Sequence, residues 1–181
     1  PMAGGYNFRD LGGFRTSDGH SVKWGQIIRS DDLFHLTESD LAYLSSLPLI
    51  SVVDFRAEGE INQAPDKLPA TATGHYLYSI TPGNLGSAMT TSLDITKGAQ
   101  AMAEINVMLV TDSLNKQRYR DYFALLQNEK DVPLLFHCSA GEDRTGMAAA
   151  LTLFALGVDE ETIMADYLSS NAYLGDKYSE Y

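Results

Sequence analysis

A short apolar run that leads into a polar loop and then into a helix is the feature that most constrains the fold. Residues 134–137, Leu-Leu-Phe-His, follow Pro133 and predict a buried strand. Residues 138–144 read Cys-Ser-Ala-Gly-Glu-Asp-Arg and lead into a helix that ends near Gly157, a residue suited to a left-handed C-terminal cap. The apolar face of this helix is expected to comprise Met147, Leu151, Phe154 and Ala155. Ligands bind at the carboxyl ends of strands in open α/β sheets, so the loop is the expected ligand site.

Strands and helices alternate along the rest of the chain. Strands are expected at 21–24, 26–29, 49–55 and 75–80, and helices near 37–47, 98–111, 113–128 and after Asp159. Residues 57–74 and 81–97 are rich in turn-forming residues and are expected to be loops. The alternation predicts a three-layer α/β fold in which helices flank a largely parallel central sheet. A length of 181 residues fits one domain over 1–181.

Charge and composition exclude several classes of function. The net charge of −11 argues against a broad nucleic-acid surface, which needs clustered Lys and Arg. The sequence has no run of 18 apolar residues that predicts a membrane span, and residues 1–5 show no signal-peptide pattern. Cys138 is the only cysteine, which excludes an internal disulfide, a thiol–metal cluster and thiol–disulfide cycling. Any chemistry of this thiol must therefore come from its surroundings.

The spacing of Cys138 and Arg144 predicts a phosphate site. Backbone N–H groups of such a turn form an anion-binding nest, and the following helix adds positive potential at its N-terminus. Arg144 can hold two phosphate oxygens at once, and the same positive field favours the thiolate form of Cys138. Thr145 is expected to donate its hydroxyl to the sulfur, or else to pack in the first helical turn. The phosphate-binding set is therefore Ser139, Ala140, Gly141, Glu142, Asp143 and Arg144.

Motifs at both ends of the chain carry a resemblance to a known family. Residues 137–146, His-Cys-Ser-Ala-Gly-Glu-Asp-Arg-Thr-Gly, resemble the protein tyrosine phosphatase signature, and residues 7–13, Asn-Phe-Arg-Asp-Leu-Gly-Gly, resemble the start of the bacterial tyrosine/lipid phosphatases. Further similar segments are Trp24-Gly25, Arg29-Ser30, Leu36-Thr37, Val53-Asp54-Phe55-Arg56, residues 165–168 and Asn171. The resemblance implies a tyrosine phosphatase-like fold, one phosphatase domain and no cofactor. It also implies a location in the cytoplasm, or secretion as in some relatives.

The resemblance implies a two-step hydrolysis of phosphomonoesters. Cys138 attacks phosphorus to form a phosphocysteine, Arg144 and the loop amides stabilise the equatorial oxygens, and water then releases inorganic phosphate. A carboxylic acid must protonate the leaving oxygen and later deprotonate the water. Asp54 matches the position of the acid in a relative, although an ion pair with Arg56 is its alternative role. Asp143 is the second candidate, with a structural pairing to Arg144 as its alternative.

Supporting residues and competing functions remain open. The family resemblance implies that His137 orients the loop by hydrogen bonding, while Arg9 and Asp10 either line the site or pin the N-terminal segment. Relatives active on lipids carry Lys at the position of Glu142, so an acid there is expected to favour phosphotyrosine proteins or small phosphomonoesters over multiply phosphorylated substrates. The alternative activities are hydrolysis of phosphoinositides or inositol polyphosphates, and phosphotyrosine binding without turnover. The sequence leaves the oligomeric state open.

Overall fold

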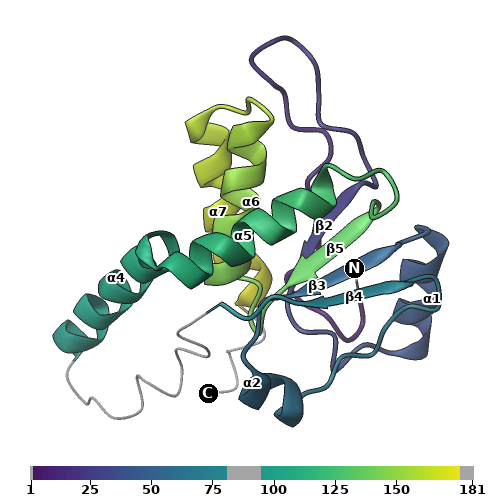
Figure 1. The fold of residues 1–181 in the computed structure, drawn as a ribbon, viewed down its shortest axis with the longest axis horizontal. Helices are drawn as coiled ribbons and strands as arrows, with labels where there is room; N and C mark the ends of the chain where they lie inside the picture. The colour runs from purple at the N-terminus through teal and green to yellow at the C-terminus, as the bar shows by residue number, and fades with distance from the viewer. Residues whose placement is uncertain (1, 81–94, 176–181) are drawn as a thin grey trace.

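A five-stranded sheet forms the centre of the molecule (Figure 1), of which the computed structural model describes residues 2–80 and 95–175. The strand order is β1-β2-β5-β3-β4, with bounds Arg9–Asp10, Ile27–Ser30, Leu134–His137, Ser51–Asp54 and Gly74–Leu77. β2, β5, β3 and β4 are parallel, and β1 pairs antiparallel with β2 at one edge. The predicted α/β fold with a largely parallel sheet is therefore confirmed. β5 lies in the middle, so the loop after it is surrounded by the ends of other strands.

Six helices are described. Their bounds are Glu38–Ser46 for α1, Glu58–Gln63 for α2, Ile95–Thr111 for α4, Ser113–Leu126 for α5, Asp143–Ala155 for α6 and Glu160–Leu174 for α7. Thr37 and Asp40 form a reciprocal cap at the start of α1, which confirms the predicted start of this helix. Gly157 has φ +81° directly after α6, as the sequence predicts. None of the described helices combines the length and apolarity needed to cross a membrane.

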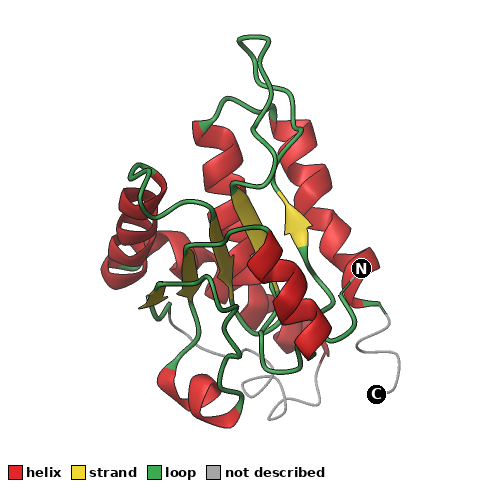
Figure 2. Ribbon diagram, turned by 90° about the vertical axis from the view of Figure 1, so that its right-hand side faces the viewer, coloured by secondary structure: helices red, strands yellow, loops and turns green. Residues whose placement is uncertain are grey.

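Helices cover both faces of the sheet, as Figure 2 shows. Successive residues of a strand point to opposite faces, so each strand contributes to two apolar cores. Val53 and Phe136 pack into a core with residues of α5 and α6, whereas Val52 and Leu135 pack into a second core with Leu44 of α1. The three predicted layers are therefore present.

Several expected elements differ from the structure. Residues 21–24 form no strand beyond a single bridge between Arg15 and Ser21. The predicted loop over 57–74 contains the short helix α2, and the loop predicted over 81–97 lies outside the described residues except for 95–97, which begin α4.

The predicted apolar face of the helix after the loop is correct only in part, because Met147 and Leu151 pack against the core whereas Phe154 and Ala155 are exposed. Phe154 is 66% exposed, while Ala148, Ala149 and Leu153 are fully buried. The reason is that α6 packs against the sheet and α7, and small residues permit this close approach.

Candidate active site

The loop between β5 and α6 brings the predicted nucleophile and arginine into one buried site. Cys138 directly follows β5 and is 3% exposed, and Arg144 lies in the first turn of α6 and is 6% exposed. Burial lowers the pKa of Arg144, but hydrogen bonding to Glu60 and the charge of Cys138 raise this pKa by more, so the net shift is upward. Arg144 is therefore a permanent cation beside the sulfur.

The backbone carbonyls of this loop are held from outside by distant segments. The N–H of Asp32 donates to the carbonyl of Ser139 at 3.2 Å. Asn7 Nδ2 donates to the carbonyls of Ala140 and Gly141 at 3.1 and 3.0 Å, and the Arg29 guanidinium donates to the latter at 2.8 Å. Because C=O and N–H point in opposite directions across a planar trans peptide, carbonyls fixed outward turn amides toward the inside of the loop. This arrangement suits an anion-binding nest.

Gly141 is required where the loop passes the end of β2. Its φ is +68°, and a Cβ at this position would lie 2.4 Å from the carbonyl oxygen of Ser30. Backbone atoms cannot yield as a side chain does, so any other residue would displace the loop.

We expect Gly141→Ala to lower kcat/KM about 100-fold, because the displaced loop no longer aligns its amides with the phosphate. Steady-state hydrolysis of p-nitrophenyl phosphate measures the loss. Gly19→Ala is the matched control, since Gly19 also has a positive φ of +86° but its added Cβ meets nothing within 4 Å. Equal losses for the two variants would contradict this role of the close contact.

Glu60, a residue that the sequence analysis does not select, holds Arg144 in place. Its Oε2 and Oε1 accept from the two terminal guanidinium nitrogens of Arg144 at 2.9 and 2.8 Å. Oε1 also accepts from the hydroxyl of Ser139 at 2.5 Å. Burial raises the pKa of Glu60, but Arg144 and Ser139 lower it more, to about 2. The pair therefore remains ionised throughout the neutral range and fixes the plane of the guanidinium.

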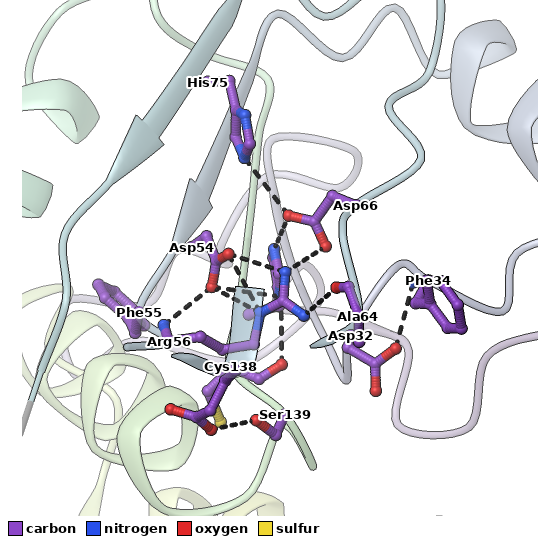
Figure 3. Close-up of polar contacts among 12 residues, drawn as sticks. Asp32, Phe34, Asp54, Phe55, Arg56, Ala64, Asp66, His75, Cys138 and Ser139 are labelled. Carbon is purple, nitrogen blue, oxygen red and sulfur yellow. Dashed lines mark hydrogen bonds and ion pairs between the residues drawn. The ribbon is translucent and has the colours of Figure 1, made fainter. Parts of the chain in front are cut away.

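Asp54 makes the ion pair that the sequence analysis gives as its alternative role. It is fully buried at the end of β3, and both oxygens accept from Arg56 Nε at 3.0 and 3.1 Å, with a further bond from a terminal nitrogen at 2.8 Å (Figure 3). The guanidinium of Arg56 also bonds Asp66 at 2.7 Å and the carbonyl of Ala64 at 2.7 Å. Arg56 thus joins β3 to the segment after α2.

One group of residues satisfies the geometry of a metal site. Asp54, Asp66 and His75 place ligand atoms within 4.8 Å of one another. However, Arg56 bonds both carboxylates, and His137 also bonds Asp66. Two cations already balance the two acids, so the cluster is explained as an ion-pair network.

The remaining predicted loop residues lie at the start of α6. Burial raises the pKa of Asp143 and Arg144 lowers it, with a net upward shift. Burial and the charge of Asp143 raise the pKa of Glu142. The buried hydroxyl of Thr145 makes no hydrogen bond to any described residue, so the expected bond to the Cys138 sulfur is not formed in this state.

The N-terminal motif acts as a support for the site. Arg9 donates to the backbone carbonyl of Asp166 at 2.5 Å and to the hydroxyl of Ser170 at 2.9 Å, both on α7. Asp10 accepts from the N–H groups of Gly12 and Gly25 at 2.8 and 2.7 Å. Of the two roles considered for Arg9 and Asp10, the structure shows the pinning of the N-terminal segment.

Comparison with known proteins agrees with these features. The sequence matches the tyrosine phosphatase family over residues 1–181. It is 38% identical over 168 residues to a Cupriavidus necator protein named as a tyrosine-protein phosphatase, covering 91% of this chain and 60% of that protein. It is 28% identical over 192 residues to the triple specificity protein phosphatase PtpB of Mycobacterium tuberculosis, covering 94% and 68%.

A solved structure is also similar to this chain. It is P. aeruginosa TpbA in complex with pTyr, with a TM-score of 0.42 and 15% identity, covering 85% of this chain and 81% of that one. Among the curated relatives, the chain spans 60% of the Cupriavidus protein and 68% of PtpB. With the match extending from the first residue to the last and the cysteine, arginine and N-terminal motif in the positions described above, the chain belongs to the tyrosine phosphatase family.

Proposed function

We propose that this domain hydrolyses phosphomonoesters through a phosphocysteine intermediate and prefers phosphotyrosine. The observation that carries this proposal is the placement of Cys138 and Arg144 on one loop in which distant segments hold the carbonyls of residues 139–141. In the first step the sulfur attacks phosphorus, the P–O bond to the substrate breaks, and the leaving oxygen takes a proton. In the second step water attacks the phosphocysteine and gives a proton to the carboxylate that protonated the leaving oxygen. The S–P bond breaks, which regenerates the thiolate and releases inorganic phosphate.

Two observations support Asp143, rather than Asp54, as the group that transfers the proton. Both oxygens of Asp54 accept hydrogen bonds from Arg56 in a site without solvent exposure, so the carboxyl group is already engaged by another side chain. Asp143 lies beside Arg144 at the start of α6, is partly exposed, and has a raised pKa. A raised pKa keeps a larger fraction of the acid protonated at working pH, which suits a proton donor.

The burial of the nucleophile and the charge of the loop support the substrate preference. Cys138 and Arg144 are almost fully buried, so the phosphate must be carried inward on an extended group, and a tyrosine ring reaches further than a serine side chain. Glu142 is a half-buried acid in the loop itself. Its charge opposes a second phosphate on the same substrate, which disfavours multiply phosphorylated inositol headgroups.

A panel of substrates tests this proposal. We expect kcat/KM to decrease in the order phosphotyrosine peptide, phosphoserine peptide, soluble short-chain phosphoinositide, each measured by phosphate release. Faster hydrolysis of the phosphoinositide would overturn the proposed preference. Glu142→Lys is expected to narrow the difference in kcat/KM between the phosphotyrosine peptide and the phosphoinositide. The reason is that it replaces a charge that repels a second phosphate with one that attracts it.

The proton donor is identified by the dependence of the rate on the leaving group. We expect Asp143→Asn to slow phenyl phosphate hydrolysis by about 10²–10⁴-fold and p-nitrophenyl phosphate by less, since nitrophenolate leaves without protonation. Asp54→Asn is expected to lower the thermal stability of the protein and to slow the hydrolysis of both substrates by the same factor. If only Asp54→Asn shows the larger loss with phenyl phosphate, Asp54 is the acid.

A further inference from the structure

A buried carboxylate with no part in the steps above, Asp66, contacts the residue that precedes the nucleophile. Its side chain is 1% exposed and belongs to the segment between α2 and β4. Oδ1 accepts from Arg56 at 2.7 Å, and Oδ2 lies 3.3 Å from Nε2 of His75 (Figure 3). Oδ2 also lies 3.1 Å from Nε2 of His137. Asp66 thus links the segment after α2 to the residue that precedes Cys138.

The two neighbours of the His137 ring determine its protonation. Burial raises the pKa of Asp66, but hydrogen bonds from His137 and His75 lower it more, so Asp66 is ionised and can only accept. Nδ1 of His137 lies 3.1 Å from the backbone carbonyl of Cys138, which also can only accept. A neutral imidazole carries one N–H, so only the imidazolium satisfies both contacts.

The charges around His137 agree with this assignment. The ring is fully buried, and burial lowers its pKa, but the charge of Asp54 at 3.9 Å and the hydrogen bond and charge of Asp66 raise the pKa to about 9, against a smaller lowering by Arg56. His137 is therefore protonated at neutral pH.

From this geometry, and resting on the proposed phosphatase function, we propose that Asp66 is a positioning residue for the nucleophile: it holds the His137 ring as a double donor, so that Nδ1 fixes the carbonyl of Cys138. The carbonyl of His137 is already fixed by the N–H of Phe55 at 2.9 Å. With both successive carbonyls held, the backbone from which Sγ projects has one orientation. Asp54 cannot replace Asp66 in this contact, because its oxygens are bonded to Arg56 and lie on the Nδ1 side of the ring.

The test measures the His137 ring directly by NMR titration of isotope-labelled histidine, with the His137 signal assigned through a His137→Gln variant. In the wild type we expect both ring nitrogens to be protonated at pH 7.5 and the ring to titrate near pH 9. In Asp66→Asn we expect the His137 pKa to fall toward the ordinary value of about 6.5. We also expect kcat for p-nitrophenyl phosphate to fall by about tenfold or more, with a smaller change in KM. The alkaline limb of the pH profile of kcat should move to lower pH.

Two control variants separate positioning from general stability. Asp40→Asn removes another buried carboxylate, one that accepts from the N–H groups of Ala3 and Gly4, and should lower stability without moving the His137 titration. His75→Gln removes the partly exposed partner of Asp66 and should leave His137 protonated at pH 7.5.

Several results would overturn the positioning role. One is a wild-type His137 that is neutral at pH 7.5, which needs no variant to detect and so remains decisive if Asp66→Asn does not fold. Another is a folded Asp66→Asn with an unchanged His137 titration and unchanged kcat. Failure of the proposed phosphatase activity would be separate, since the wild type would then not release phosphate whatever the state of His137.

Discussion

Cys138→Ser is expected to lower kcat for phosphomonoesters by about 10⁴-fold or more, while phosphate still binds. A serine hydroxyl is a much weaker acid and a much weaker nucleophile than a thiol, so the variant lacks the nucleophile of the first step. The loop amides and Arg144 are unchanged, and these groups bind the phosphate. Steady-state kinetics with p-nitrophenyl phosphate measures the loss, and calorimetry with inorganic phosphate measures the retained binding.

Trapping of the intermediate provides the control for this variant. Acid quenching of the wild type with a ³²P-labelled substrate should yield labelled protein, and the single cysteine in the sequence makes the assignment of the labelled thiol unambiguous. Cys138→Ser should yield none. Turnover of this variant at the wild-type rate would rule out the phosphocysteine route.

Arg144→Lys is expected to lower kcat/KM by about 10²–10³-fold, the cost of removing a positioned donor from a developing oxyanion. Lysine keeps the charge but has one nitrogen in place of a planar fork. In the structure, two guanidinium nitrogens bond the two oxygens of Glu60 at 2.8 and 2.9 Å, which fixes the plane of the guanidinium. A lysine ammonium cannot make this pair of contacts and hold two phosphate oxygens as well.

Arg118→Lys is the matched control for this substitution. Arg118 lies on α5 and pairs with Asp121 three residues later at 3.5 Å, with both side chains partly exposed. Such pairs contribute little to stability, so this variant should retain wild-type kcat/KM. If Arg144→Lys loses no more activity than Arg118→Lys, the proposed role of the guanidinium fork is wrong.

The sequence predicts the parts of this molecule that depend on local pattern. The apolar runs at β3 and β5 and the loop between Cys138 and Arg144 lie where expected, because each is specified by neighbours in the chain. The expected strand at 21–24 is not formed, because the structure of this segment depends on contacts with residues outside it. Trp24, which the sequence pattern assigns to a short strand, is 69% exposed, and its ring lies over Gly12 and Gly13.

The partners of the catalytic groups could not be predicted in the same way. Glu60 bonds Arg144 across 84 residues, and Asp66 bonds His137 across 71. Both acids belong to a segment that contains two prolines and the six-residue helix α2, which includes Gly59. A helix of six residues is too short to show a clear helical period in the sequence. A partial signal existed in the capping pattern of Ala57 and Glu60, where the glutamate accepts from the N–H three residues earlier. It predicts a helix start but not the distant arginine.

The outward-held carbonyls of the loop have a consequence for the order in which the protein is made. Asn7 and Arg29 are synthesised before the loop, and the carbonyl of Gly141 that they bond follows 134 and 112 residues later. Asp166, which fixes Arg29 at 2.6 Å, is 137 residues beyond it. A growing chain therefore exposes Cys138 before the groups that frame its loop are joined. The loop gains its full set of supporting contacts only after the segment that forms α7 has been synthesised and has docked.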